Sequence, residues 1–203
     1  MQVPNFVNMD QLQTAISTRN YNETLRVCEE LELLNATGEV RCSMSEVYAV
    51  QLAVYLIFND LNSARFLWKR ILLAGQKNDE INAIWNVCTA LWQRNYSQFY
   101  AAIDGYSWSP LLSSIIADIK DSVRKSLLYL LGKAYTNIQL QDAVHYFGLS
   151  ENDLISALVA EGWQYDENAR MFIPKKQENV PRSSTGLPQL TSFTQIVLDL
   201  ESY

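Results

Sequence analysis

The sequence has few of the side chains that build metal, redox or hydrolytic centres. Its 203 residues include one histidine, His145, and three cysteines, Cys28, Cys42 and Cys88. A zinc site or a disulfide framework needs paired spacings that these residues do not have. A metallo-isopeptidase or a histidine-assisted hydrolase needs partners for its histidine. We therefore predict no catalytic residue, no metal site and no cofactor, and we interpret the cysteines as small core residues.

Glycine, long apolar runs and positive charge are also scarce. The seven glycines stand singly, so there is no glycine-rich phosphate loop. The runs Ala53–Phe58 and Leu127–Leu131 are too short to span a bilayer, and the first residues lack the pattern of a secretory signal. A net charge of −6 argues against nucleic acid, whose phosphates bind clustered Lys and Arg. We expect a soluble intracellular protein without a membrane partner.

What the sequence does contain is helical periodicity, interrupted by a recurring turn. Asn59 is suited to the left-handed conformation that closes a helix, and the Asp60 carboxylate is suited to capping the next one. Similar polar residues precede Tyr21 and Tyr96, so that Tyr21, Leu61 and Tyr96 follow one another at spacings of 40 and 35 residues. Such spacings are typical of helix-turn-helix repeats that stack into a curved solenoid.

Helix signals continue through the first 136 residues. The first two helices are predicted near Met9–Ser17 and Tyr21–Leu34. A third is predicted to begin with a capping box, in which the side chains of Ser43 and Glu46 satisfy each other's backbone amides. Asp79 is predicted to cap a later helix with a wide apolar stripe.

The last helical pattern of this region is unusually long. Ser109-Pro110 supplies a cap and a proline at the first helical position, and the apolar spacing holds to about Asn137. At 1.5 Å per residue this is roughly 40 Å of helix. The sequence leaves open whether the helix breaks near Lys120–Asp121.

The pattern changes at Ile138. Two short helices, each ended by a glycine, precede two short alternating strands around a polar turn, which Pro174 stops. This order predicts a winged helix over residues 137–174. The segment has six acidic residues and one basic residue, which argues against DNA. Two predicted helices are mildly basic: one carries Arg65, Lys69, Arg70 and Lys77, and the other carries Lys120, Arg124, Lys125 and Lys133. Their basic residues either form a solvated face or bind an acidic protein partner, and both interpretations stay open.

The carboxy-terminal residues read as a linker and a final helix. Residues 175–186 cannot bury a core and are predicted to be flexible. Residues 187–203 are predicted to form an amphipathic helix whose apolar seam needs a partner, either the body of the chain or another protein's helix. The predicted fold is thus mainly α, with a TPR-like helical-repeat solenoid over residues 1–136, a winged-helix subdomain with a small β-hairpin, and this last helix.

Six motifs carry a resemblance to known proteins: Tyr55-Leu56-x-x-Asn59-Asp60-x-Asn62-x-Ala64-Arg65-Phe66-Leu67-Trp68-Lys69-Arg70, Ile84-Trp85-Asn86-Val87, Leu91-Trp92-Gln93-Arg94, Trp108-Ser109, Gly162-Trp163-Gln164 and the final stretch from Gln189-Leu190 to Leu200-Glu201. The chain resembles the PCI family of scaffold subunits from about Tyr48 onward. Members of that family are scaffold subunits of the proteasome lid, the COP-nine signalosome and a translation-initiation assembly. The motifs are most similar to the small PCI subunits of the signalosome.

The resemblance implies a non-catalytic scaffold subunit of the complex that removes the ubiquitin-like modifier Nedd from cullins, which regulates cullin–RING ubiquitin ligases in cytoplasm and nucleus. It implies a hetero-oligomer with other PCI subunits and with metalloprotease-bearing subunits. Alternatives are a small PCI subunit of the proteasome lid or of an initiation factor, and a winged-helix nucleic-acid regulator. The implied contact residues are Trp163, Tyr165, Met171 and Phe172 in the winged helix and Leu190, Phe193, Val197, Leu198 and Leu200 in the last helix.

Overall fold

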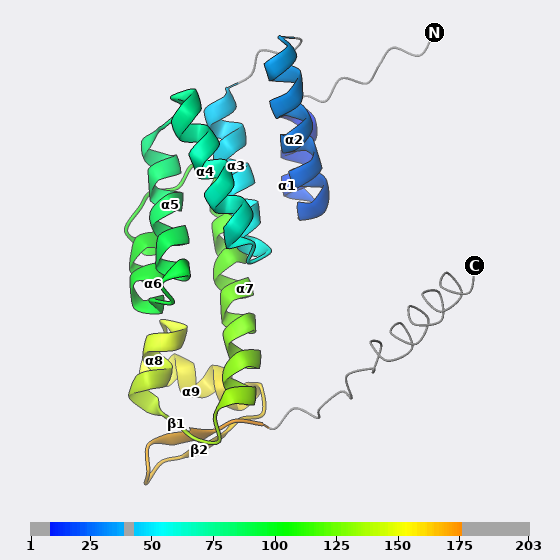
Figure 1. The fold of residues 1–203 in the computed structure, drawn as a ribbon. Helices are drawn as coiled ribbons and strands as arrows, with labels where there is room; N and C mark the ends of the chain where they lie inside the picture. The colour runs from blue at the N-terminus through cyan, green and yellow to red at the C-terminus, as the bar shows by residue number, and fades with distance from the viewer. Residues whose placement is uncertain (1–8, 39–42, 176–203) are drawn as a thin grey trace, which may run out of the picture.

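The computed structural model describes residues 9–38 and 43–175, and over these residues the chain is mainly helical (Figure 1). The predicted last helix, residues 187–203, and the linker from residue 176 lie outside the described residues, as does Cys42. The helices are α1 (Met9–Ser17), α2 (Tyr21–Thr37), α3 (Met44–Ile57), α4 (Leu61–Ala74), α5 (Asp79–Trp92), α6 (Tyr96–Asp104), α7 (Pro110–Ala134), α8 (Leu140–Phe147) and α9 (Glu151–Ala160). The strands are β1 (Ile138–Gln139), β2 (Gln164–Asp166) and β3 (Met171–Ile173).

Six of these helices form three pairs, α1/α2, α3/α4 and α5/α6, and each pair folds back through the same kind of turn (Figure 1). One turn residue has a positive φ of 55–56°, and the next residue caps the second helix by accepting a hydrogen bond from the amide three residues on. The prediction for Asn59 and Asp60 is confirmed. The left-handed residues are Arg19, Asn59 and Arg94, and the caps are Asn20, Asp60 and Asn95.

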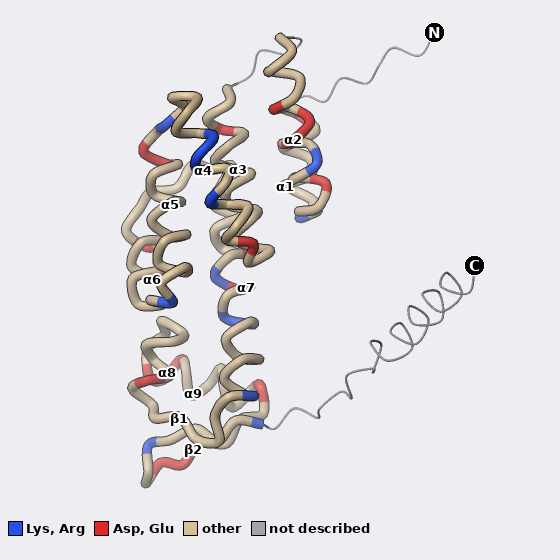
Figure 2. Tube along the Cα trace, viewed as in Figure 1, with Lys and Arg blue, Asp and Glu red and all other residues tan. Residues whose placement is uncertain are grey.

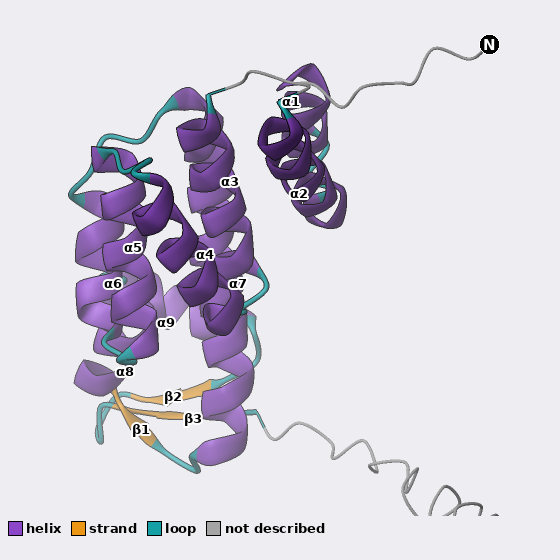
Figure 3. Cartoon of the chain, turned by 45° about the horizontal axis from the view of Figure 1, so that its top comes forward, coloured by secondary structure: helices purple, strands orange, loops and turns teal. Residues whose placement is uncertain are grey.

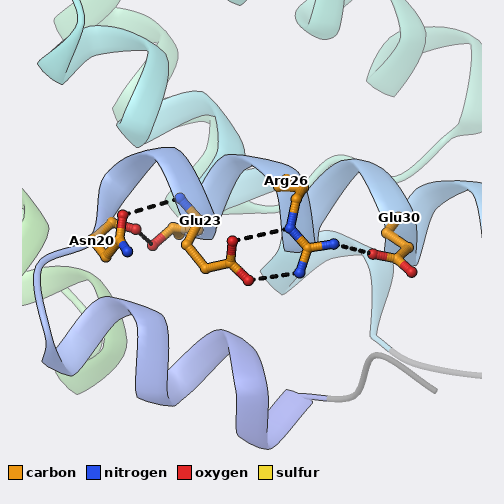
Figure 4. Close-up of polar contacts among 5 residues, drawn as sticks. Asn20, Glu23, Arg26 and Glu30 are labelled. Carbon is orange, nitrogen blue, oxygen red and sulfur yellow. Dashed lines mark hydrogen bonds and ion pairs between the residues drawn. The ribbon is translucent and has the colours of Figure 1, made fainter. Parts of the chain in front are cut away.

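The first of these turns shows how polar side chains start a helix (Figure 4). The Oδ1 atom of Asn20 accepts a hydrogen bond from the Glu23 amide at 3.3 Å. One turn further on, Arg26 donates to the Glu23 carboxylate at 2.6 Å and to the Glu30 carboxylate at 2.8 Å. These ion pairs lie in water on the outer face of α2, where screening leaves them little stabilising effect. The cap and the buried face therefore fix this helix.

Helix α3 is the centre of the first hydrophobic core. Eleven of its fourteen residues are buried, and it contacts α2, α4, α5 and α7. Leu31 of α2, Leu67 of α4, Ile84 of α5 and Ile115 of α7 belong to the same core and are fully buried. A helix that is apolar on all sides can be satisfied only by neighbours on all sides, which the three pairs and α7 supply.

Helix α7 runs without a break from Pro110 to Ala134, so the long helical pattern is one helix. Leu112, in its first turn, lies in the core around α3, whereas Leu127 and Leu131, near its end, lie in a second core with α8, α9 and the sheet. One helix therefore belongs to both cores. The pairs and the carboxy-terminal unit are joined by continuous helix and not by a loop.

The carboxy-terminal unit closes on a three-stranded antiparallel sheet with the order β1-β3-β2 (Figure 3). Phe172 in the middle strand lies opposite Ile138 of β1 and Tyr165 of β2. The two alternating strands that the sequence predicts are confirmed as β2 and β3. Strand β1 was not predicted, because two residues are too few for an alternating pattern and only pairing with β3 defines them.

Two predicted helix starts differ in the structure. Ser43 precedes α3, but its side chain makes no capping hydrogen bond, so the capping box with Glu46 is wrong. The Ser43 hydroxyl instead lies 3.2 Å from the Ser45 hydroxyl, within hydrogen-bond distance. Helix α5 is capped by Asn78, whose Oδ1 atom accepts a hydrogen bond at 2.6 Å. Asp79 is instead the first helical residue, where its negative charge favours the helix dipole.

Candidate interaction surfaces

Among the described residues, the histidine is exposed and the two cysteines are buried in a core. His145 is exposed on α8, and its Nδ1 atom lies 3.3 Å from the Ser97 hydroxyl. Within residues 9–38 and 43–175 there is no cluster of His, Cys, Asp and Glu that could hold a metal ion, and no helix there is long and apolar enough to cross a membrane. Burial raises the pKa of the Cys28 thiol to about 12 and that of Cys88 to about 11. Both are free and buried in the first core, as predicted.

The structure brings the four predicted winged-helix contact residues together at the sheet. Trp163 is 5% exposed and Phe172 is fully buried, and both belong to the second core. Tyr165 and Met171 are half-buried, and the ring centroids of Tyr165 and Phe172 are 4.9 Å apart. Ile173, which the sequence did not single out, is 42% exposed. The remaining predicted contact residues, Leu190, Phe193, Val197, Leu198 and Leu200, lie outside the described residues.

A polar and aromatic joint connects the helix pairs to the carboxy-terminal unit. Tyr100 of α6 donates a hydrogen bond to the Tyr146 carbonyl, and Arg124 of α7 donates one to the Phe147 carbonyl, both at 3.3 Å. The Arg124 guanidinium also lies 5.4 Å from the centroid of the Tyr100 ring. Burial raises the pKa of Tyr100, although Arg124 opposes the shift. The phenol is therefore a neutral donor at this joint, and the end of α8 at Gly148 is in contact with its ring.

A second polar contact joins the first turn to α7. The Tyr21 hydroxyl donates a hydrogen bond to the Asp118 carboxylate, and the Arg19 guanidinium lies 3.4 Å from the other oxygen of that carboxylate. Burial, together with the hydrogen bond to Asp118 and its negative charge, raises the pKa of Tyr21. Helix α7 thus receives polar contacts from both ends of the series of pairs.

Helices α4 and α5 present aromatic rings together with cations, and Figure 2 shows the basic residues along α4. The rings of Trp68 and Trp85 stack with centroids 4.7 Å apart and planes 1° from parallel. Phe66 is 60% exposed and Trp92 is 51% exposed. The sequence grouped the basic residues but missed the ring pairs, since these form between helices. The cations lie over rings as follows: Arg65 over Trp92 at 6.0 Å, Lys69 over Phe66 at 5.8 Å and Lys77 over Trp68 at 5.4 Å.

Three helix pairs, a helix shared by two cores and a small sheet-containing unit define a mainly helical protein whose candidate sites are surfaces. The chain belongs to the CSN8/PSMD8/EIF3K family, whose model matches residues 42–183. The match includes the whole described range 43–175.

Relatives of this chain are similar to it over nearly their whole length. It is 36% identical over 183 residues to the COP9 signalosome complex subunit 8 of Danio rerio, covering 89% of this chain and 95% of that protein. The subunit of the same name from Xenopus tropicalis is 36% identical over 177 residues, covering 86% and 90%. The subunit of that name from Arabidopsis thaliana is 30% identical over 196 residues, covering 96% and 100%.

Proposed function

We propose that this chain is a non-catalytic scaffold subunit of a COP9 signalosome. In that role it serves the removal of the ubiquitin-like modifier Nedd from cullins, and so the regulation of cullin–RING ubiquitin ligases, in cytoplasm and nucleus. The observation that carries the proposal is the nearly end-to-end similarity to three relatives that bear the signalosome name. The same observation favours the signalosome over the proteasome lid and the initiation factor, which are the alternatives within the family.

The proposed architecture is that of a PCI domain, with TPR-like helix pairs over residues 1–136 and a winged helix over residues 137–174. Three turns of the same geometry, each closing one helix pair, support the repeat. The order β1, α8, α9, β2, β3 and the antiparallel β2–β3 pair support the winged helix. Residues 175–186 are the proposed linker, and residues 187–203 the proposed assembly helix.

The proposed contact on the winged helix is its outer edge at β2. Because β2 is an edge strand, it has backbone groups that a neighbouring protein can pair with. Tyr165 and Met171 are placed to touch such a partner, whereas Trp163 and Phe172 would shape the surface from within the core. The proposed partners are other PCI subunits and metalloprotease-bearing subunits, which makes the chain part of a hetero-oligomer.

The charge of the same unit supports a protein partner over nucleic acid. Helix α9 begins with Glu151 and Asp153, and the turn between β2 and β3 carries Glu167 (Figure 2). Carboxylates at the start of the helix that would face DNA repel phosphates.

The proposal is tested by affinity purification of the full chain beside a variant that ends after Pro174, with mass spectrometry of the proteins that co-purify. We expect the full chain to bring down PCI and metalloprotease-bearing subunits, and the shortened variant to lose most of them. If both purify alone, the assembly proposal is wrong.

A point variant makes the test sharper. Phe193→Asp places a charge in the apolar seam of the last helix, whereas Gln195→Asp adds the same charge outside the seam. We expect the first change to remove co-purifying subunits and the second to retain them. Equal loss in both variants would mean that the seam is not what binds.

A further inference from the structure

Two adjacent hollows lie along α4, α5 and α7. One, of about 310 Å³, lies between α4 and α5, and the other, of about 370 Å³, extends from α4 and α5 to α7. Leu61 and Trp92 line both hollows, so the two are adjacent. We call this feature the α4–α7 trough; its apolar lining includes Trp85, Leu61, Trp92, Val123, Leu127 and Leu130.

The trough combines exposed apolar surface with positive charge. Trp92 is 51% exposed and Leu130 is 58% exposed. Arg65 and Arg94 line it, and no acidic residue is among the described residues that do. Asp60 is adjacent in sequence to Leu61, but its carboxylate already accepts hydrogen bonds from the Ser63 amide and hydroxyl. The surface therefore suits a segment that is apolar on one face and acidic elsewhere.

Residues 187–203 of this chain have that composition. They contain the apolar positions of the predicted seam, the acidic residues Asp199 and Glu201, and no Lys or Arg. A helix of this length is about 25 Å long, which suits an extended trough. Charge and apolar character are thus complementary between the segment and the trough.

The segment can also reach the trough. The described chain ends at Lys175, whose carbonyl oxygen lies 3.9 Å from where a side chain on Gly132 would begin. Lys175 therefore lies beside the end of α7, and Gly132 is two residues from Leu130, which places it about 160° around the helix from that residue. Residues 176–186 span up to about 36 Å when extended, and α7 from Gly132 back to Val123 covers only about 14 Å.

We infer that, in the unassembled chain, residues 187–203 dock in the α4–α7 trough. The apolar seam covers Trp92 and Leu130, and the acidic side chains lie toward Arg65 and Arg94. This goes beyond the scaffold proposal, because it gives the assembly helix a second, intramolecular position. The helix shields its seam in the free subunit and exchanges the trough for partner helices when the subunit assembles.

The test uses the full chain with a benzophenone photo-cross-linking amino acid in place of Phe193. After irradiation of the monomer, we expect mass spectrometry to find cross-links to the α4–α7 trough. Ser126→Glu and Leu130→Glu place a negative charge in the trough, so each is expected to abolish these cross-links. Leu73→Glu is the matched control, since Leu73 lies on α4 outside the trough and is 90% exposed; it should leave them unchanged.

Three results would overturn the inference: cross-links only outside the trough, cross-links that persist in both charged variants, or cross-linked dimers whose yield rises with protein concentration. The last would assign the trough to a second copy of the chain. Ser126 is exposed, so its variant folds, and far-ultraviolet circular dichroism checks this. The outcome is independent of affinity purification, which measures the binding of other proteins.

Discussion

At the scale of single residues, the three left-handed turn positions show that both residue type and hydrogen bonding determine the backbone conformation. Arg19, Asn59 and Arg94 have nearly the same positive φ, a region in which asparagine is favoured and arginine is not. The sequence therefore pointed clearly to Asn59 and only loosely to the arginines. In all three turns the left-handed residue and its successor donate backbone hydrogen bonds to the end of the preceding helix. These bonds impose the geometry even where the residue type resists it.

Asp60 supplies the cap of the central turn, so replacing it should weaken α4. We expect Asp60→Ala to lower the free energy of unfolding by about 1 kcal/mol, because the Ser63 amide loses its acceptor. Asp60→Asn keeps a side-chain oxygen and should cost much less. Urea denaturation of the three proteins measures the difference, and equal losses in both variants would show that the charge and not the cap matters.

The same residue predicts a dependence on pH. Hydrogen bonds from the Ser63 hydroxyl and amide hold the pKa of Asp60 below its ordinary value. A lowered pKa in the folded state means that the charged form stabilises the fold above the unfolded pKa of about 3.9 and that this contribution is lost as the pH falls through the folded value. The stability advantage of the wild type over Asp60→Asn should therefore shrink below about pH 4, as measured by denaturation at stepwise lower pH. A constant difference would contradict this.

Among the glycines that the structure describes, Gly148 has the least freedom to change. It has a φ of 59°, and an added Cβ would overlap the ring of Tyr100. We expect Gly148→Ala to lower the free energy of unfolding by about 3 kcal/mol, from backbone strain and overpacking together. Gly75→Ala is the control, since Gly75 has a φ of 66° but open space around it; it should cost about 1 kcal/mol. Thermal denaturation distinguishes the two, and similar losses would mean that the Tyr100 contact adds nothing.

At the scale of elements, the sequence predicted the helices and strands that are marked by apolar periodicity and by turn and cap residues. The helix pairs, the unbroken spacing of α7 and the strands β2 and β3 all have such signals. Strand β1 has two residues and exists because β3 lies beside it, so no local pattern could reveal it. The cap at Ser43 failed for a local reason, since its hydroxyl lies beside that of Ser45, two residues along the chain. Strand β1 and the stacked rings of Trp68 and Trp85 were missed because each depends on a segment distant in the sequence.

Phe172 is the side chain on which the sheet and its helices pack. It is fully buried in the middle strand, so Phe172→Ala should open a cavity and cost about 3–5 kcal/mol of unfolding free energy. Ile173→Ala, at the next position but 42% exposed, should cost less than about 1 kcal/mol. Chemical denaturation followed by near-ultraviolet circular dichroism provides the comparison. A small loss for Phe172→Ala would mean that the second core repacks easily.

At the scale of the whole molecule, the candidate surfaces depend on how units sit together, which sequence patterns describe least well. Trp163 and Phe172 were named as contact residues only because the resemblance to the PCI family implies a contact on the winged helix. Their burial in the second core separates the supporting residues from the accessible ones, Tyr165 and Met171. The trough that joins α4, α5 and α7 likewise has no signature in any one helix, because each contributes only part of the lining.

The shared helix α7 sets more than the distance between the two cores. Each residue in an α-helix turns the chain by about 100° and advances it by about 1.5 Å. One residue added between Ile119, in the first core, and Leu127, in the second, would therefore swing the edge strand β2 to another side of the molecule. The number of residues along this stretch sets the rotation of one core relative to the other. The length of α7, as much as its composition, therefore sets which way β2 faces relative to the helix pairs.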